Sequence, residues 1–233
     1  FQLPNIFRRL FAEGAFAAAF VPLFNQRMTT EGDHSEARAF ADAVLAVLIP
    51  ILIVFSALLL IVMPWIMHLF ASEALRADGE KFDLTVMMAR IAFPYLAFMS
   101  IATLFAAILN SLSRFAAAAA APILLNICLV AALLLGMVTG DGGDAAKAAT
   151  GLYLAISVSL AGLFQLVWLL FWVRRSGFRP ALRRPQLTPG VREMGVLILP
   201  AVFGAGVYQI SRFVDLFFIA SLPDKSITYL AMA

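Results

Sequence analysis

The sequence predicts an all-α protein, a polytopic membrane helix bundle with about six transmembrane helices. Of its 233 residues, 63% are hydrophobic and only 13% are charged, whereas soluble domains lie nearer half and a quarter. The mean hydropathy is +0.94. Several apolar runs are long enough to cross a bilayer, which takes about 20 residues of helix. These observations exclude a water-soluble monomer.

The first expected span covers residues 3–24 and is unusual because it contains Arg8, Arg9 and Glu13. Ionisable side chains are costly in lipid, so this helix must turn their side toward protein or water. Four strongly apolar spans follow, at residues 43–67, 84–110, 115–140 and 148–173. Each is long enough to cross the hydrocarbon core as a helix.

Two further spans carry charge inside an apolar run, about two turns from the start of one and near the middle of the other. Arg90 interrupts the span at residues 84–110, and we expect its side chain to extend outward to the membrane surface. The sixth span, residues 194–222, contains Arg212 and Asp215. Prolines inside or at the start of spans predict kinks, where neighbouring helices can satisfy the freed backbone carbonyls; they lie at positions 50, 64, 94, 122 and 200.

The loops predict the orientation in the membrane. Residues 174–192 contain no acid and six arginines, which are Arg174, Arg175, Arg179, Arg183, Arg184 and Arg192. Short cytoplasmic loops are enriched in Lys and Arg, so we expect this loop in the cytoplasm. Alternation then puts residues 25–42 and the turn at Arg114 on the same side, and residues 68–83 and 141–147 outside. The simplest interpretation of the arginines is a topology signal that also meets anionic headgroups, rather than a specific ligand site.

The residue patterns of an enzyme are missing, and we expect no catalytic residue and no metal site. His34 and His68 are far apart, and there is neither an HExxH motif nor a phosphate-binding loop. Gly204 and Gly206 form an isolated GxG inside an apolar span, which helix packing explains better than a dinucleotide site. The net charge of +3 comes mainly from one loop and does not favour nucleic acid as a partner.

The charges of the first span have two interpretations. Arg9 and Glu13 are spaced i,i+4 and can meet on one helical face, whereas Arg8 points about 100° away and has no local partner. The arginines could be anchors whose head groups reach the membrane interface. Alternatively they could form an anion site in a wet cavity, because the planar guanidinium binds phosphate with two hydrogen bonds.

Arg212 and Asp215 also leave two alternatives. Their i,i+3 spacing would allow them simply to neutralise one another. A carboxylate at membrane depth could instead form a cation or proton site that couples an ion gradient to movement.

Specific strings resemble one family. LPNIFRRLFAEGAFAAAFVPLF at the start resembles the second transmembrane helix of the MurJ/MviN family, bacterial lipid II flippases of the MOP exporter superfamily. ARIAFPYLAFMSIATLFAAILNSLSRF followed by APILLNI resembles the fourth and fifth helices, and GVYQISRFVDLFFIASL resembles the seventh. The resemblance implies a MOP-type helix bundle of which this chain represents about helices two to seven of fourteen.

The resemblance also implies roles for single residues. Arg8 matches an arginine of the central cationic cavity that engages the lipid-linked diphosphate, and Arg9 and Glu13 belong to the same substrate-binding motif. Asp215 matches an acid of the seventh helix that contributes to a sodium site in some members. A coupling ion, sodium or proton, is the only cofactor expected.

The expected function is to flip lipid II, an undecaprenyl-diphosphate-linked peptidoglycan precursor, across the bacterial inner membrane by alternating access of two lobes. Residues 1–193 would supply helices of the N-terminal lobe, with the basic cytoplasmic loop at 174–193, and residues 194–233 the first helix of the C-terminal lobe. The alternatives are an exporter of another polyprenyl-diphosphate-linked oligosaccharide and a membrane scaffold that transports nothing. The expected partners are the lipid substrate and the surrounding membrane lipids.

Overall fold

The computed structural model describes residues 15–28, 34–70, 73–140, 143–200 and 203, and every regular element in them is a helix. A short helical segment at residues 189–200 follows the last of the numbered helices. These helices are α2 (Ala15–Gln26), α3 (Ser35–Phe70), α4 (Glu73–Ala77), α5 (Gly79–Ala92), α6 (Tyr95–Ser111), α7 (Phe115–Thr139) and α8 (Asp144–Arg175).

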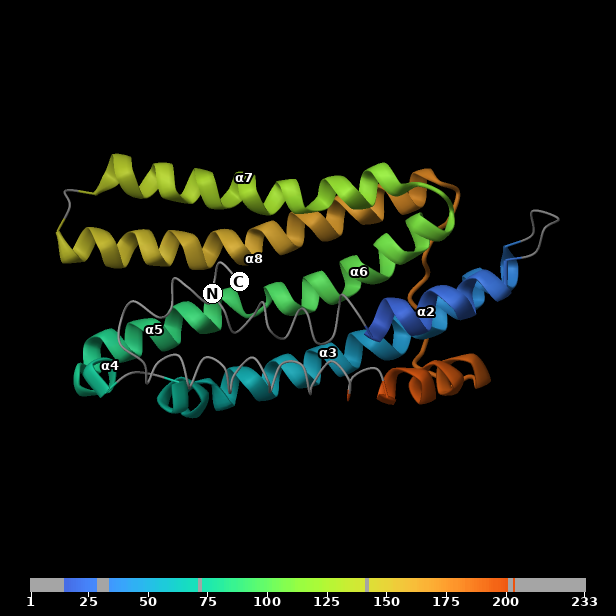
Figure 1. Ribbon diagram of the computed structural model, residues 1–233, viewed down its shortest axis with the longest axis horizontal. Coiled ribbons are helices and arrows are strands. Elements are labelled where there is room, and N and C mark those ends of the chain that lie inside the picture. Colours follow the sequence, from blue (N-terminus) through green and yellow to red (C-terminus); the bar gives the residue numbers. More distant parts are fainter. Residues whose placement is uncertain (1–14, 29–33, 71–72, 141–142, 201–202, 204–233) are drawn as a thin grey trace, which may run out of the picture.

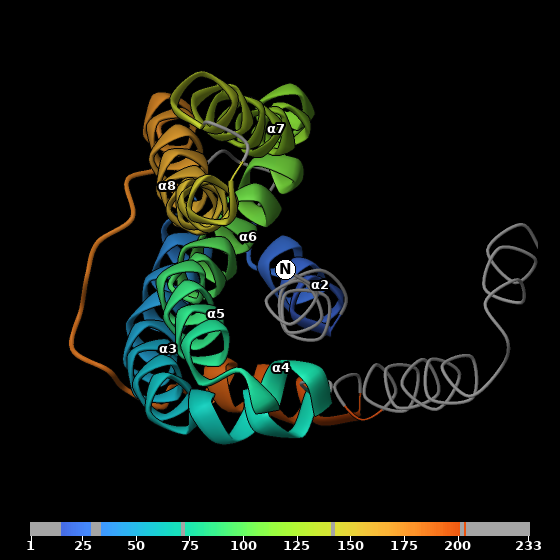
Figure 2. The same ribbon diagram turned by 90° about the vertical axis from the view of Figure 1, so that its left-hand side faces the viewer.

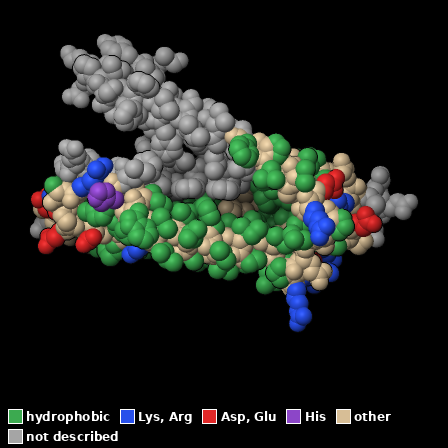
Figure 3. Space-filling model, turned by 90° about the horizontal axis from the view of Figure 1, so that it is seen from below, with side chains coloured by type: hydrophobic (Ala, Val, Ile, Leu, Met, Phe, Trp, Pro, Cys, Tyr) green, Lys and Arg blue, Asp and Glu red, His purple; other side chains and the backbone are tan. Residues whose placement is uncertain are grey.

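Four helical stretches in the described part are long and apolar enough to cross a membrane. They are Ser35–His68, Gly79–Ser111, Phe115–Thr139 and Asp144–Arg175. They match the four central spans that the sequence predicts, with the span at 115–140 ending one residue beyond its helix, and they confirm a polytopic membrane helix bundle. Figure 3 shows the corresponding surface, with hydrophobic side chains across the middle and most charged side chains at the two ends. The first and last predicted spans fall only partly within the described residues, which are helical at 15–26 and 189–200.

The long helices run side by side along one axis (Figure 1). Seen along that axis, α7, α8, α6, α5 and α3 follow one another in a curved row, and α2 lies on the concave side of the row (Figure 2). The contacts agree with this order, because α8 packs against α7, α6 and α5, while α2 packs against α6 and α3.

The spans alternate in direction, so their connections gather at two ends of the bundle (Figure 1). The turn between α6 and α7, the start of α3 and the end of α8 lie together at one end, which we call the basic end because the arginine-rich loop leaves from it. The α4 region and the α7–α8 connection lie at the opposite end. This arrangement agrees with the alternation predicted from the spans.

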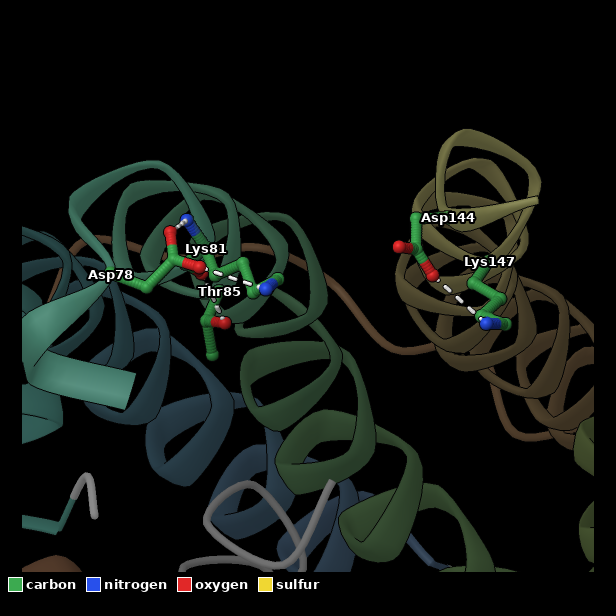
Figure 4. Close-up of polar contacts among 5 residues, drawn as sticks. All are labelled: Asp78, Lys81, Thr85, Asp144 and Lys147. Carbon is green, nitrogen blue, oxygen red and sulfur yellow. Dashed lines mark hydrogen bonds and ion pairs between the residues drawn. The ribbon is translucent and has the colours of Figure 1, made fainter. Parts of the chain in front are cut away.

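The end opposite the basic end carries two local ion pairs on helix starts (Figure 4). Asp78 caps α5, since its Oδ1 accepts the N–H of Lys81 at 3.1 Å and its Oδ2 lies 2.8 Å from Lys81 Nζ. Lys147 Nζ donates to Asp144 Oδ1 at 2.9 Å in the first turn of α8. Acidic groups at helix N-termini are favoured by the helix dipole.

Two prolines interrupt the helical hydrogen bonding of membrane spans, and a side chain from another helix donates to a backbone carbonyl near each of them. Pro64 has no N–H, which leaves the carbonyl of Leu60 without its helical partner. Arg90 Nε on α5 donates to this oxygen at 3.0 Å. Arg90 therefore bridges two helices rather than serving only as an anchor at the membrane surface.

The second interruption separates α5 from α6. The chain turns at Phe93 and Pro94, so the span predicted at residues 84–110 consists of two helices. The hydroxyl of Ser159 on α8 donates to the carbonyl of Ile91 next to this break. This hydrogen bond joins α8 to the end of α5 beside the break.

Two glycines allow α8 to pack closely against its neighbours α7 and α6. A Cβ at Gly136 of α7 would lie 2.5 Å from Thr150 Oγ1 of α8. A Cβ at Gly162 of α8 would lie 2.8 Å from Cδ2 and 3.3 Å from Cα of Tyr95 on α6. Such small residues bring helices together in membranes, where packing rather than the hydrophobic effect holds them.

Candidate functional site

The residues predicted for substrate binding and ion coupling lie outside the described residues. Arg8, Arg9 and Glu13 precede α2, and Asp215 follows the helical segment 189–200. Their arrangement stays a prediction. The described residues show instead how the neighbouring segments are held at the basic end of the bundle.

Helix α2, which follows the predicted substrate-binding motif, is fixed by a row of phenylalanines. Phe16, Phe20 and Phe24 are spaced i,i+4,i+8 and are all buried. The rings of Phe16 and Phe20 stack with centroids 5.7 Å apart, and those of Phe20 and Phe24 lie 5.3 Å apart. Phe20 also stacks on Phe40 of α3 at 5.5 Å. Because large buried rings dominate packing energy, the phenylalanine face holds α2 against α3 and α6.

The basic loop predicted at residues 174–193 is non-helical only from 176 to 188, because α8 continues to Arg175 and helix resumes at 189. Gly177 has a φ of +83°, a left-handed conformation that ends the helix and suits glycine. From there the chain crosses back toward α3 (Figure 2). Three groups of contacts attach it.

The first attachment is a buried carboxylate on α3. Asp42 is 1% exposed. Its Oδ1 accepts the backbone N–H of Ala181 at 2.8 Å, and its Oδ2 lies 3.4 Å from Arg183 Nε. The second distance is that of an ion pair without a short hydrogen bond, which leaves Oδ2 buried without a hydrogen-bond donor among the described residues. A buried charge is tolerated when it is paired and hydrogen-bonded, so the loop is needed to cover Asp42.

The second attachment involves Arg38, one turn before Asp42. Its guanidinium donates to the carbonyl of Gly177 at 3.2 Å and lies 5.6 Å from the centre of the Phe178 ring. Phe178 is buried and packs against Phe24 of α2, with ring centroids 5.8 Å apart. The loop therefore inserts an aromatic side chain between the first two described helices.

The third attachment joins α2 to the helical segment 189–200. Arg27 donates to the carbonyl of Leu23 at 2.7 Å and to Glu193 Oε2 at 3.1 Å. Its guanidinium also lies 4.5 Å from the centre of the Phe40 ring, a cation–π geometry. One arginine thus holds three helical elements together.

Sequence reasoning missed these anchors. It began the second span at residue 43, whereas α3 begins at Ser35 and includes Arg38 and Asp42. Hydropathy marks the part of a helix inside the hydrocarbon and not the turns that project beyond it. The available signal was an acid, Asp42, directly before an apolar run in a chain whose residues 174–192 contain six arginines and no acid.

Arginines in the same loop remain without such contacts. Arg174, Arg175 and Arg179 line an open pocket of about 550 Å³ together with Phe171 and Pro180. Within the described ranges no carboxylate lies at ion-pair distance from any of the three. The basic end thus combines paired arginines that attach the loop with unpaired arginines that face outward.

Comparisons with known proteins agree with the membrane bundle. A family model described as "Lipid II flippase MurJ" matches residues 1–233. "Probable lipid II flippase MurJ" of Rhizobium meliloti (strain 1021) is 42% identical over 233 residues, which are 100% of this chain and 42% of that protein. The protein of the same name in Rickettsia prowazekii (strain Madrid E) is 33% identical over all of this chain and 44% of its own length.

A third relative is named "Lipid II flippase MurJ" and comes from Burkholderia cenocepacia. It is 32% identical over 100% of this chain and 44% of its own length. The chain therefore spans less than half the length of these curated relatives. With a family match over every residue and several such relatives, the resemblance found in the sequence is confirmed, and the chain belongs to the MurJ family of lipid II flippases.

Proposed function

We propose that this chain is part of a protein that flips lipid II from the cytoplasmic to the periplasmic leaflet of the bacterial inner membrane. The observation that carries the proposal is the match of the lipid II flippase family to all 233 residues. The four apolar spans support a multi-pass membrane protein. Moving a lipid between leaflets breaks no covalent bond, so the activity is transport and not catalysis.

The proposed substrate contact is made by the motif before α2. Arg8 would bind the diphosphate with its planar guanidinium, while Arg9 and Glu13 would neutralise one another beside it. The buried phenylalanine row of α2 supports this proposal, because a firmly packed helix directly after the motif would limit how far the bound headgroup could move.

The proposed energy source is an ion that binds at Asp215. A carboxylate in a membrane helix is costly unless a cation or proton compensates it. Sodium or proton binding there would bias the protein between inward-facing and outward-facing states. Residues 1–193 would move as part of one lobe and residues 194–233 as part of the other.

The test uses the complete protein in a bacterium whose native copy can be depleted. Wild type should prevent lysis and the accumulation of lipid II in the inner leaflet, and Arg8→Ala should fail at normal abundance. Arg8→Lys should restore part of the activity, because lysine keeps the charge but cannot form the bidentate hydrogen bonds of a guanidinium group. Arg184→Ala is the matched control, since it removes an exposed arginine of the loop.

Other outcomes would contradict the proposal. Normal precursor export by Arg8→Ala would make Arg8 a membrane anchor only. Accumulation of a different polyprenyl-linked sugar on depletion would replace lipid II as the substrate, and normal wall synthesis with loss of a protein complex would indicate a scaffold. Transport by Asp215→Asn with unchanged dependence on sodium and pH would leave Asp215 as the structural partner of Arg212.

A further inference from the structure

The end of α8 carries a concentration of positive charge that the attachment of the loop does not use. Arg174, Arg175 and Arg179 line the pocket of about 550 Å³, and its remaining lining residues, Phe171 and Pro180, are apolar. We infer that this pocket binds the phosphodiester headgroup of an anionic phospholipid of the surrounding membrane. The site is separate from the proposed flipping of lipid II and does not depend on it.

Two acids of the basic end are engaged elsewhere, and a third, Glu36 in the first turn of α3, forms no ion pair with the pocket arginines. Asp42 accepts from Ala181 and pairs with Arg183, and Glu193 pairs with Arg27. In the part of the chain that the structure describes, the three pocket arginines have no acidic partner. Guanidinium groups bind phosphate oxygens through strong, paired hydrogen bonds, so a phosphodiester could supply the negative charge that these arginines lack.

The dipole of α8 explains only part of the cluster. Arg174 and Arg175 lie in the last helical turn, where positive charge is favoured. Arg179 lies beyond the helix in the loop, where this effect has faded. A ligand bound by all three arginines would explain the position of Arg179, which the helix dipole does not explain.

The loop holds Arg179 in place from both sides. Before it, the carbonyl of Gly177 accepts from Arg38 and the ring of Phe178 is buried. After it, the N–H of Ala181 bonds to Asp42. Because the backbone on either side is already ordered, binding costs less conformational entropy than it would for an arginine on a free loop.

The position of the pocket favours a lipid over a soluble phosphate. Residues 148–173 contain no charged side chain. At about 1.5 Å per residue such a helix spans more than the roughly 30 Å hydrocarbon core, so Arg174 and Arg175 lie at headgroup level. Phe171, one turn earlier, is 57% exposed and offers an apolar surface to an acyl chain. Headgroup and chain would therefore both find a contact.

The experiment measures phosphatidylglycerol binding to the complete purified protein in detergent by native mass spectrometry. We expect Arg179→Gln to weaken binding about fivefold, the effect of one arginine near an anionic lipid. Arg184→Gln is the matched control, because it removes the same charge from the same loop at a position that does not line the pocket. It should change binding less than twofold. Phosphatidylcholine should bind more weakly than phosphatidylglycerol to the wild type.

A second variant separates a built site from diffuse charge. Asp42→Ala removes a negative charge, so general electrostatic attraction would strengthen binding of an anionic lipid. In the proposed site the same change frees the loop around Arg179 and should weaken binding. Circular dichroism of Asp42→Ala and its melting curve verify that the helices remain folded.

Three results would overturn the inference. Equal losses in Arg179→Gln and Arg184→Gln would show that only the total charge matters. Tighter binding by a folded Asp42→Ala would show the same. Displacement of the lipid by millimolar inorganic phosphate would assign the pocket to a soluble phosphate instead.

Discussion

Arg90 on α5 donates its Nε–H to the carbonyl oxygen of Leu60 on α3 at 3.0 Å. That oxygen is the acceptor that Pro64, four residues later, leaves without a helical donor. The pair connects a charge in one membrane helix to the proline-containing turn of another.

The first prediction follows from this pair. Arg90→Ala should lower the free energy of unfolding by about 1 kcal/mol, a typical value for a hydrogen bond between membrane helices. In a Pro64→Ala background the restored N–H of residue 64 can bond to Leu60, so removing Arg90 should cost less. Thermal unfolding of the four proteins in detergent, followed by tryptophan fluorescence, measures the coupling. Equal costs in both backgrounds would contradict the link between Arg90 and Pro64.

The second prediction concerns the contact between α6 and α8. Gly162→Ala places a methyl group 2.8 Å from the ring of Tyr95 and 3.3 Å from its Cα, so one helix has to move. Overpacking of this kind costs about 1–3 kcal/mol. Gly195→Ala is the control, because a Cβ there meets nothing within 4 Å and alanine favours helix. A melting temperature equal to that of the control would show that α6 and α8 adjust freely.

The third prediction is a pH dependence at the end opposite the basic end. Hydrogen bonding to Lys81 lowers the pKa of Asp78 below the ordinary 3.8. A carboxyl group whose pKa falls on folding stabilises the protein above its unfolded pKa, and this stabilisation is lost as the pH falls through the folded pKa. Asp78→Ala should therefore lower the melting temperature at pH 7 and lower it less near pH 3.

Asp78→Asn separates the two roles of this residue. Asparagine is also a good N-cap but cannot form the ion pair. We expect it to melt between wild type and Asp78→Ala at pH 7. A difference between wild type and Asp78→Ala that does not change with pH would assign the whole effect to capping.

The fourth prediction concerns orientation, which rests on the arginine-rich loop. In a Cys128→Ala background, a cysteine introduced as Arg184→Cys should be shielded from a membrane-impermeant maleimide in intact cells. One introduced as Asp144→Cys, at the opposite end of α8, should react. Both should react after the membrane is permeabilised. The reverse pattern in intact cells would invert the topology and move the basic end to the periplasm.

The sequence was sufficient for the spans but not for their ends. The apolar runs at 43–67 and 148–173 lie within single helices, the run at 84–110 extends across α5 and α6, and the run at 115–140 ends one residue beyond α7. Spans are predictable because side chains that face lipid are apolar. The sequence did not predict the start of α3 at Ser35, and at Pro94 it predicted a kink where the structure ends one helix and begins another. A projecting helical turn is as polar as a loop, and a proline can either kink a helix or end it.

The contacts of the basic end could not be predicted for a different reason. The bond from Ala181 to Asp42 joins residues 139 positions apart, and its donor is a backbone group that every residue except proline possesses. Only the path of the loop places the N–H of Ala181, and not that of another residue, next to Asp42. The motif charges Arg8, Arg9 and Glu13 and the acid Asp215 were proposed from sequence and resemblance, and they lie beyond the described residues.

The bond from Arg90 to the Leu60 carbonyl also changes how polar residues in this family should be interpreted. A search for a permeation route usually starts from the charged side chains that lie within the membrane. Arg90 would rank high in such a search, and so would Ser159 among hydroxyl groups, yet each donates to a backbone carbonyl near a proline of another helix. A map of the route should therefore first leave out the side chains that donate to backbone carbonyls near prolines. In related sequences, loss of the proline at position 64 should relax selection on the arginine at position 90.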